Sequence, residues 1–166
     1  MTVSNITFRR YRASHDAVRA NDIYCHAIET LTDDYYSREQ RQVWADWGSD
    51  GERLSKLLSQ GITIVAETPQ TLAGFAQLFP LYQVNMLYVR PECGRQGIGS
   101  QLLTILESLA TRLGQRSLTT RASRASRPVF ERAGFVVDRR EIATRNGIEL
   151  EGFRMSKPLE PGRNRP

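Results

Sequence analysis

Hydrophobic and polar residues change their spacing several times along the chain, and each change predicts a different element. In residues 6–11, Ile6 and Phe8 alternate with polar neighbours, which is typical of a strand. Residues 14–31 have instead the three-and-four spacing of an amphipathic helix, with Ser14 as its expected N-cap. The buried side of this helix is expected to contain Val18, Ile23, Ala27, Ile28 and Leu31.

Two segments then have the spacing of a capping box, Ser37 to Gln40 and Ser49 to Glu52. In this motif a serine and the Glu or Gln three residues later satisfy each other's backbone N–H groups, so each segment predicts the start of a short helix. A β-branched run at 62–66 and the segment 72–79 predict the two arms of a hairpin that turns at 69–71.

A third apolar segment, residues 83–89, ends before Pro91 and precedes a long helix over 98–113. Gly114 is its expected C-terminal stop. One apolar stripe recurs along that helix at three and four residues. The stripe consists of Ile98, Leu102, Ile105, Leu106, Leu109 and Leu113.

The remaining sequence predicts a strand, a short helix and a hairpin, at residues 117–121, 126–133, and 135–143 with 148–155. Asn146-Gly147 joins the hairpin arms and is a strong signal for a two-residue turn. The short helix is expected to close at Gly134.

The predicted order is one strand, helices, three strands, a helix, a strand, a helix and two strands, which is neither a repeated βαβ array nor a β-sandwich. We therefore expect the α/β class (mixed α+β), with a largely antiparallel sheet of about seven strands. The 166 residues suit one domain. We place it at residues 1–160 and expect a disordered tail at 161–166.

Several features predict a cytoplasmic protein with no membrane partner. No apolar run approaches the ~20 residues of a membrane span, and the first ten residues lack the apolar centre of a signal peptide. Cys25 and Cys93 suit unpaired thiols in a reducing compartment. No His/Cys cluster has metal-ligand spacing, so we predict no metal.

The net charge of +5 is unevenly distributed. Residues 1–89 have 8 Arg and Lys against 10 Asp and Glu, whereas residues 90–166 have 15 against 8. The basic half suits an anionic cofactor, nucleic acid or a solvated arginine-rich surface. Nucleic acid is disfavoured, because no basic strand interleaved with aromatic residues and no recognition helix accompanies the charge.

Residues 89–100, VRPECGRQGIGS, contain the most chemical information. Gly94, Gly97 and Gly99 lie between a strand and the long helix, so backbone N–H groups there can approach an anion closely. The first helical turn adds unpaired N–H donors and a partial positive charge, and Arg95 adds a cation. The segment predicts a pyrophosphate site. Its spacing differs from dinucleotide and Walker motifs; a glycine-rich joint without a ligand is the structural alternative.

In these residues the sequence resembles the GNAT superfamily of N-acetyltransferases. Residues 94–99, Gly-Arg-Gln-Gly-Ile-Gly, match the family's Arg/Gln-x-x-Gly-x-Gly/Ala signature except at the first position. Ser123 to Phe135 is similar to its Asn-x-x-Ala…Tyr-x-x-x-Gly-Phe signature, and Tyr35-Tyr36-Ser37 with Trp44 resembles a small single-domain bacterial branch. The likeness covers roughly residues 5–159 and implies a GNAT fold, whose twisted sheet splays at the cofactor site.

The resemblance implies acetyl-CoA as the cofactor and suggests how the chain would hold it. The backbone of Leu87, Tyr88 and Val89 is expected to pair with the pantetheine arm like an added strand. Ser123, Ser126 and Phe130 are expected along the pantetheine near the thiol. The residues expected around the pyrophosphate are Arg95, Gln96, Gly97, Ile98, Gly99 and Ser100. The basic half of the chain, which contains Arg95, Arg124 and Arg127, would suit the three phosphates of this cofactor.

Two positions depart from the family pattern. Gly94 replaces the usual Arg or Gln, so one phosphate contact is missing unless Arg95 compensates. Phe130 replaces the tyrosine that in many members protonates the leaving thiolate, and phenylalanine has no proton to donate. An acyl-CoA-binding sensor that has lost catalysis is therefore the alternative to an enzyme.

The resemblance implies direct transfer of an acetyl group to the primary amine of a small molecule or peptide. An amine with pKa ~10.4 is neutral in about one of 10³ molecules at pH 7, so a general base is expected. The candidate catalytic residues are Asp34 and Tyr36, on an acidic and aromatic rim, and Tyr88 as a proton donor.

The sequence does not identify the acceptor amine, the general base or the proton donor. It also leaves open whether the protein forms a homodimer. Trp44 and Trp47 are expected either in the core or as a wall of the acceptor pocket.

Overall fold

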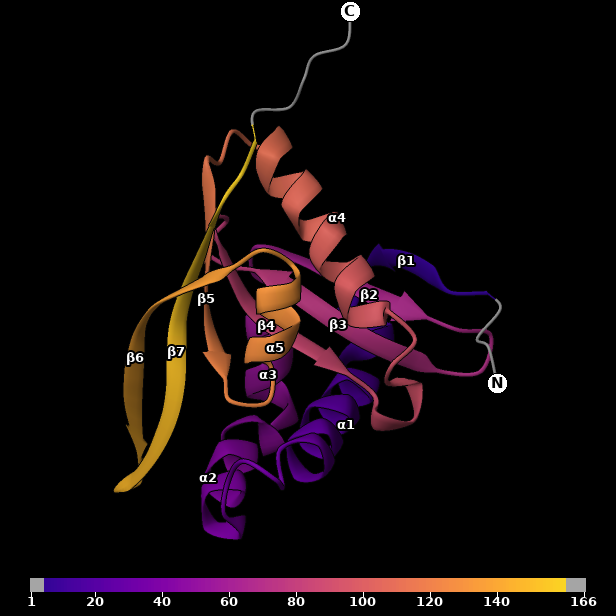
Figure 1. Cartoon of the computed structure of the whole chain (residues 1–166). Coiled ribbons are helices and arrows are strands. Elements are labelled where there is room, and N and C mark those ends of the chain that lie inside the picture. The colour runs from indigo at the N-terminus through magenta and orange to yellow at the C-terminus, as the bar shows by residue number, and fades with distance from the viewer. Residues whose placement is uncertain (1–4, 161–166) are drawn as a thin grey trace, which may run out of the picture.

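The computed structural model describes residues 5–160, which form one seven-stranded sheet with helices on both faces (Figure 1). The strands are β1 (Thr7–Arg10), β2 (Ile62–Glu67), β3 (Leu72–Leu78), β4 (Gln83–Val89), β5 (Ser117–Ser123), β6 (Val136–Arg145) and β7 (Ile148–Pro158). The helices are α1 (Ala13–Leu31), α2 (Arg38–Ser49), α3 (Gly51–Leu58), α4 (Ile98–Arg112) and α5 (Arg127–Arg132), with a 3₁₀ turn η1 (Pro91–Cys93). The helices of this range are all too short or too polar to cross a membrane. The expected tail at 161–166 lies outside the described residues.

The strand order is β1-β2-β3-β4-β5-β7-β6. Every neighbouring pair is antiparallel except β4 and β5, which run parallel. In the described range, β4 and β5 pair only at Gln83 with Thr119 and Val84 with Thr120. Beyond these pairs the two strands separate, which confirms the predicted mixed fold with a largely antiparallel, splayed sheet.

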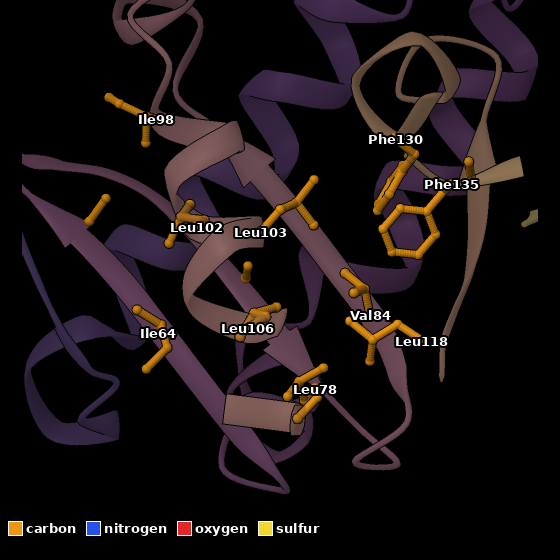
Figure 2. Packing of buried hydrophobic residues seen from close by; sticks show 14 of the residues in the cluster. Ile64, Leu78, Val84, Ile98, Leu102, Leu103, Leu106, Leu118, Phe130 and Phe135 are labelled. Carbon is orange, nitrogen blue, oxygen red and sulfur yellow. The ribbon is translucent and has the colours of Figure 1, made fainter. Parts of the chain in front are cut away.

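Two hydrophobic clusters lie on opposite faces of the sheet. Leu102, Leu103 and Leu106 of α4 are fully buried against one face, and Figure 2 shows this cluster with residues of the sheet and of the α5 region. The other face is covered by α1 and α3, whose side chains pack around the buried ring of Phe75. Complete burial of each such side chain stabilises the fold by about 1.5–3 kcal/mol.

The predicted apolar stripe of α4 is largely correct, because Ile98, Leu102 and Leu106 are buried. The exception is Leu113, which lies one residue beyond the end of α4 and is exposed.

The start of α1 differs from the prediction. The helix begins at Ala13, and the Ser14 hydroxyl bonds to the neighbouring His15 ring instead of capping the helix. The Asp16 carboxylate caps it from within, accepting from the Arg12 N–H at 2.8 Å. Asp16 is fully buried and also binds the guanidinium of Arg9 at 2.8 and 2.9 Å. A buried acceptor of this kind replaces the local serine cap.

The predicted buried side of α1 is partly wrong. Ile23, Ala27 and Ile28 are buried, but Val18 is 83% exposed and Leu31 is 44% exposed. Val18 is five residues before Ile23, which places the two side chains about 140° apart around the helix. Leu31 is the last helical residue.

The two capping predictions also have different outcomes. Ser37 and Gln40 form the complete predicted capping box of α2. In α3 the cap is Asp50 rather than Ser49, because the Asp50 carboxylate accepts from the N–H groups of Glu52 and Arg53.

The C-terminal hairpin is confirmed and is longer than predicted. Asn146 and Gly147 both have positive φ, 48° and 78°, as a two-residue turn of the primed kind requires. The hairpin places Arg145 at the free end of β6, opposite Ile148.

Candidate active site

The chain between β4 and α4 forms a loop whose backbone is unusual at two positions. Arg95 has φ 59° and Gly97 has φ 75°, both in the left-handed region. A non-glycine residue pays about 1–2 kcal/mol for this conformation, so Arg95 is strained. Gly97 is the N-cap of α4, and its side-chain position faces open space, with Gln101 Nε2 as the nearest atom at 3.8 Å.

These dihedrals leave a run of backbone donors without acceptors. Within residues 5–160, the N–H groups of residues 95–100 make no hydrogen bond to the protein. The first bond of this region is from the Gln101 N–H to the Gly97 carbonyl, at 3.0 Å. The buried side-chain oxygen of Gln96 also has no partner. Six consecutive N–H donors before and at a helix start provide the chemistry that binds a diphosphate.

The edge of β4 beside this loop is also unpaired, because β5 separates from it after Val84. This edge includes Leu87, Tyr88 and Val89, the residues predicted to pair with pantetheine. Their other edge pairs with β3 in regular antiparallel register. The open edge therefore offers extended backbone groups to a peptide-like ligand.

A β-bulge at Asn85 changes the direction of the side chains along β4. Gln77 of β3 is opposite Met86 and Leu78 is opposite Val84, so Asn85 is the extra residue. Its side-chain amide donates to the oxygen of Gln77 at 2.9 Å. Gln77 is fully buried, and its own amide donates to the carbonyls of Leu57 and Gln60. This buried network fixes the bulge where the strands separate.

The opposite wall is formed where β5 leads into α5. The Ser126 hydroxyl accepts from the Ser123 N–H at 2.9 Å, and the Ser123 hydroxyl accepts from the Ser126 N–H at 3.0 Å. Phe130 is only 3% exposed, and its ring packs edge to face against Phe135 with centroids 5.2 Å apart (Figure 2). The two serines thus form a rigid turn at the end of β5, while the Phe130 ring lies in the core.

An aromatic wall, defined as Tyr24, Tyr36, Trp44, Trp47 and Tyr88, covers the α1 and α2 side of the site. The rings of Tyr24 and Tyr88 have centroids 4.9 Å apart, and Tyr24 and Trp47 are 6.3 Å apart. Tyr36 meets Trp44 edge to face at 5.4 Å. Burial raises the pKa of Tyr88 to about 12. Both tryptophans are partly buried, so they contribute to the core and to this wall.

The three candidate catalytic residues occupy different environments. Tyr36 is buried, and its hydroxyl donates to the Glu151 carbonyl at 2.5 Å and accepts from the Arg124 N–H at 2.9 Å. Tyr88 belongs to the same aromatic wall. Asp34 is exposed, two residues before Tyr36 in the segment between α1 and α2.

The arginines expected near phosphates are not equivalent. Arg124 binds the carboxylate of Glu151 at 2.8 Å, and Arg127 binds that of Glu131 at 2.7 Å. Arg95 is exposed and has no ion pair with any residue of the described range. Of the three, Arg95 is therefore the one whose guanidinium is available. The same range contains no cluster of three or more His, Cys, Asp or Glu side chains that could hold a metal ion.

Sequence reasoning missed one residue of this region, Arg145. Its guanidinium carbon lies 5.7 Å from the centroid of the Trp47 ring. Its Nη1 atom is buried and has no hydrogen-bond partner. The available signal is weak: an arginine directly before the Asn146-Gly147 turn whose cross-strand neighbour, Ile148, is not acidic.

Comparison with known proteins agrees with this geometry. Residues 32–157 match the family described as "Acetyltransferase (GNAT) domain". The chain is 29% identical over 153 residues to the uncharacterized N-acetyltransferase YafP of Escherichia coli (strain K12), covering 92% of this chain and 96% of YafP.

Two solved structures extend this comparison. A GCN5-related N-acetyltransferase from Rhodopseudomonas palustris has a TM-score of 0.90 and 33% identity, over 96% of this chain and 99% of that one. PaiA N-acetyltransferase from Thermoplasma acidophilum, solved with coenzyme A, has a TM-score of 0.75 and 19% identity, over 93% and 99%. The family match and the likeness to the Rhodopseudomonas palustris protein confirm the resemblance drawn from residues 94–99: the chain belongs to the GNAT family of acetyltransferases.

Proposed function

We propose that the protein transfers an acetyl group from acetyl-CoA to the primary amine of a small molecule or peptide. The observation that carries this proposal is the run of six unpartnered N–H donors at residues 95–100, next to the open edge of β4. The donors suit a diphosphate and the edge suits the amide-containing pantetheine arm. The coenzyme A complex of PaiA supports the assignment.

Residues of this chain would hold the cofactor in three groups. Backbone N–H groups of 95–100, with the Arg95 guanidinium, would bind the pyrophosphate. The backbone of Leu87, Tyr88 and Val89 would pair with pantetheine, and Ser123 and Ser126 would line its other side. Phe130 would contribute apolar backing from the core, since its ring is buried. When bound, acetyl-CoA supplies the thioester carbonyl that an amine attacks.

Side chains on the α1 and α2 side would then accept and donate the protons that the transfer requires. Because burial raises the pKa of Tyr88 to about 12, its hydroxyl keeps its proton at neutral pH, which suits a donor rather than a base. Asp34 is exposed and would accept a proton from the incoming ammonium, directly or through water. Both hydrogen bonds of the Tyr36 hydroxyl are already made, so we assign it to positioning the α1–α2 segment.

A sensor that binds acyl-CoA without turnover is the second candidate, favoured by the absence of a hydroxyl at Phe130. Calorimetric titration with acetyl-CoA, combined with thiol release in the presence of an amine panel, separates the two. The proposal predicts saturable binding and release with at least one amine. Binding with no release for any amine would support the sensor, and absence of binding would exclude both.

The assignment of Asp34 is tested by a pair of neighbouring variants. Asp34→Asn is expected to lower kcat by about 10²-fold, in the range typical of a lost general base, without changing acetyl-CoA affinity. Asp33→Asn is the matched control, because Asp33 is also exposed. Equal thiol-release rates for the two variants would remove Asp34 from the mechanism.

A further inference from the structure

Arg145 reaches the aromatic wall from a part of the chain distant in sequence. It is the last residue of β6, and Figure 1 shows the free end of the β6–β7 hairpin beside α2. A hydrogen bond from the Gln40 side chain to the Glu149 carbonyl, 2.8 Å, fixes the hairpin against α2. The Arg145 guanidinium lies over Trp47, where a cation is favoured by the face of the ring.

The charge of Arg145 has no counterpart in the described part of the chain. Other arginines of the same strand are paired, Arg139 with Glu141 and Arg140 with Glu151. Arg145 forms no ion pair with residues 5–160, and its buried Nη1 donates to nothing there. Arg145 as a whole is partly buried, but a buried donor atom without an acceptor is costly, so the Nη1 atom points to a ligand that supplies the acceptor.

The two tyrosines that interact with Arg145, Tyr24 and Tyr88, are neutral at physiological pH. Burial raises the pKa of Tyr24 far above its ordinary value, although the neighbouring Arg145 opposes this shift. The Tyr24 hydroxyl donates to the Trp44 carbonyl at 3.0 Å. Burial likewise keeps Tyr88 protonated. No ionised tyrosine therefore balances the guanidinium, whose planar N–H groups match a carboxylate.

We propose that Arg145 binds the carboxylate of the acceptor, so that the acceptor is an amino acid or a similarly carboxylated small amine. This inference rests on the proposed acetyl transfer and specifies its substrate class. A polyamine is disfavoured, because a second cation would approach Arg145 beside the same rings. A phosphate group would satisfy the same N–H donors, so the experiment has a separate arm for it.

Tryptophan fluorescence is suited to the test, because the only two tryptophans of the chain, Trp44 and Trp47, both belong to the aromatic wall. Protein saturated with CoA is titrated with amines that differ only by the carboxylate: leucine and isoamylamine, lysine and cadaverine, phenylalanine and phenethylamine. Phosphoethanolamine and ethanolamine form the phosphate arm. The CoA titration that precedes these measurements tests the proposed function separately.

The inference predicts that at least one carboxylated amine binds about tenfold or more tightly than its partner, as the loss of one charge-assisted hydrogen bond implies. Arg145→Gln should abolish that difference, and Arg145→Lys should restore part of it. Arg139→Gln removes an exposed charge from the same strand and should retain it. Thermal unfolding of each variant confirms that the hairpin is intact.

Three results would overturn the inference: equal binding within every pair, a preference that survives in Arg145→Gln, or a preference for the phosphate arm alone. Failure to bind CoA at all would instead remove the proposed function, and the inference with it.

Discussion

Tyr88 contributes to both sides of the proposed active site. Its backbone belongs to the open edge of β4, and its ring packs between Tyr24 and Phe75 with centroids 4.9 and 5.5 Å away. Burial disfavours the phenolate, so the pKa rises from about 10 in an unfolded chain to about 12 in the folded protein. The residue that we assign as proton donor is therefore also coupled to stability.

That coupling predicts a specific loss of stability at alkaline pH. Between pH 10 and 12 the unfolded chain has released the Tyr88 proton and the folded chain has not, so the free energy of unfolding falls as pH rises. Tyr88→Phe removes this contribution. The stability difference between wild type and Tyr88→Phe should shrink by about 1–3 kcal/mol from pH 9 to pH 12, measured by urea unfolding.

The comparison isolates Tyr88, because the other buried tyrosines remain in both proteins. Parallel stability curves for wild type and variant over this range would contradict the burial of the phenol.

At the scale of elements, the segment between α1 and α2 is tied to the far side of the sheet by Tyr36. Its hydroxyl joins the Glu151 carbonyl of β7 to the Arg124 N–H at the end of β5. The Arg124 side chain reinforces the tie by binding the Tyr35 carbonyl at 3.1 Å and the Glu151 carboxylate at 2.8 Å. These contacts fix the segment between α1 and α2 against β7 and the chain that follows β5.

Removing that hydroxyl should destabilise the protein and leave cofactor binding intact. Tyr36→Phe leaves the Arg124 N–H without its acceptor and removes the bond to the Glu151 carbonyl, which costs about 1–3 kcal/mol in the free energy of unfolding. Tyr35→Phe is the matched control, because Tyr35 is 43% exposed. Denaturant unfolding and acetyl-CoA titration are measured on both variants; a stable Tyr36→Phe protein would show that the tie is dispensable.

The elements predicted correctly from sequence are those whose signals are local. The capping box of Ser37 and Gln40, the Asn146-Gly147 turn and the glycines at 94–99 each act within a few residues. The predicted Ser14 cap is wrong, because the real cap, Asp16, depends on Arg9 in another element. Local pattern cannot reveal such a partner.

The same difference between local signals and distant partners applies to the candidate site. The donors of residues 95–100 could be located because a single loop provides them all. The bulge at Asn85 depends on Gln77 in β3, and the position of Arg145 depends on Trp47, about a hundred residues away in the sequence. Both contacts depend on how the strands pair in the sheet, so the sequence predicted neither the bulge at Asn85 nor the position of Arg145.

For the whole molecule, the separation of β4 and β5 divides the site between two parts of the chain. The part before this gap supplies the open strand edge and the aromatic wall. The part after it supplies Ser123, Ser126 and Arg145. Because Arg124 and Arg127 are paired internally, the excess positive charge of residues 90–166 does not by itself specify where phosphates bind. The backbone donors at 95–100 are the structural basis for that assignment.

Two glycines of the same helix allow a direct test of these donors. Gly97 and Gly114 lie at opposite ends of α4 with φ 75° and 80°, and neither has an atom within 3.4 Å of its side-chain position. Aspartate tolerates this backbone region better than most residues. At position 97 a carboxylate also favours the helix N-terminus, so Gly97→Asp should fold normally.

The decisive measurement is the affinity for acetyl-CoA of wild type, Gly97→Asp and Gly114→Asp, determined by calorimetric titration. The new carboxylate at 97 would repel the diphosphate and displace its hydrogen bonds, so binding should weaken at least about tenfold. Gly114→Asp should bind as wild type does. Unchanged affinity in a folded Gly97→Asp protein would contradict the account.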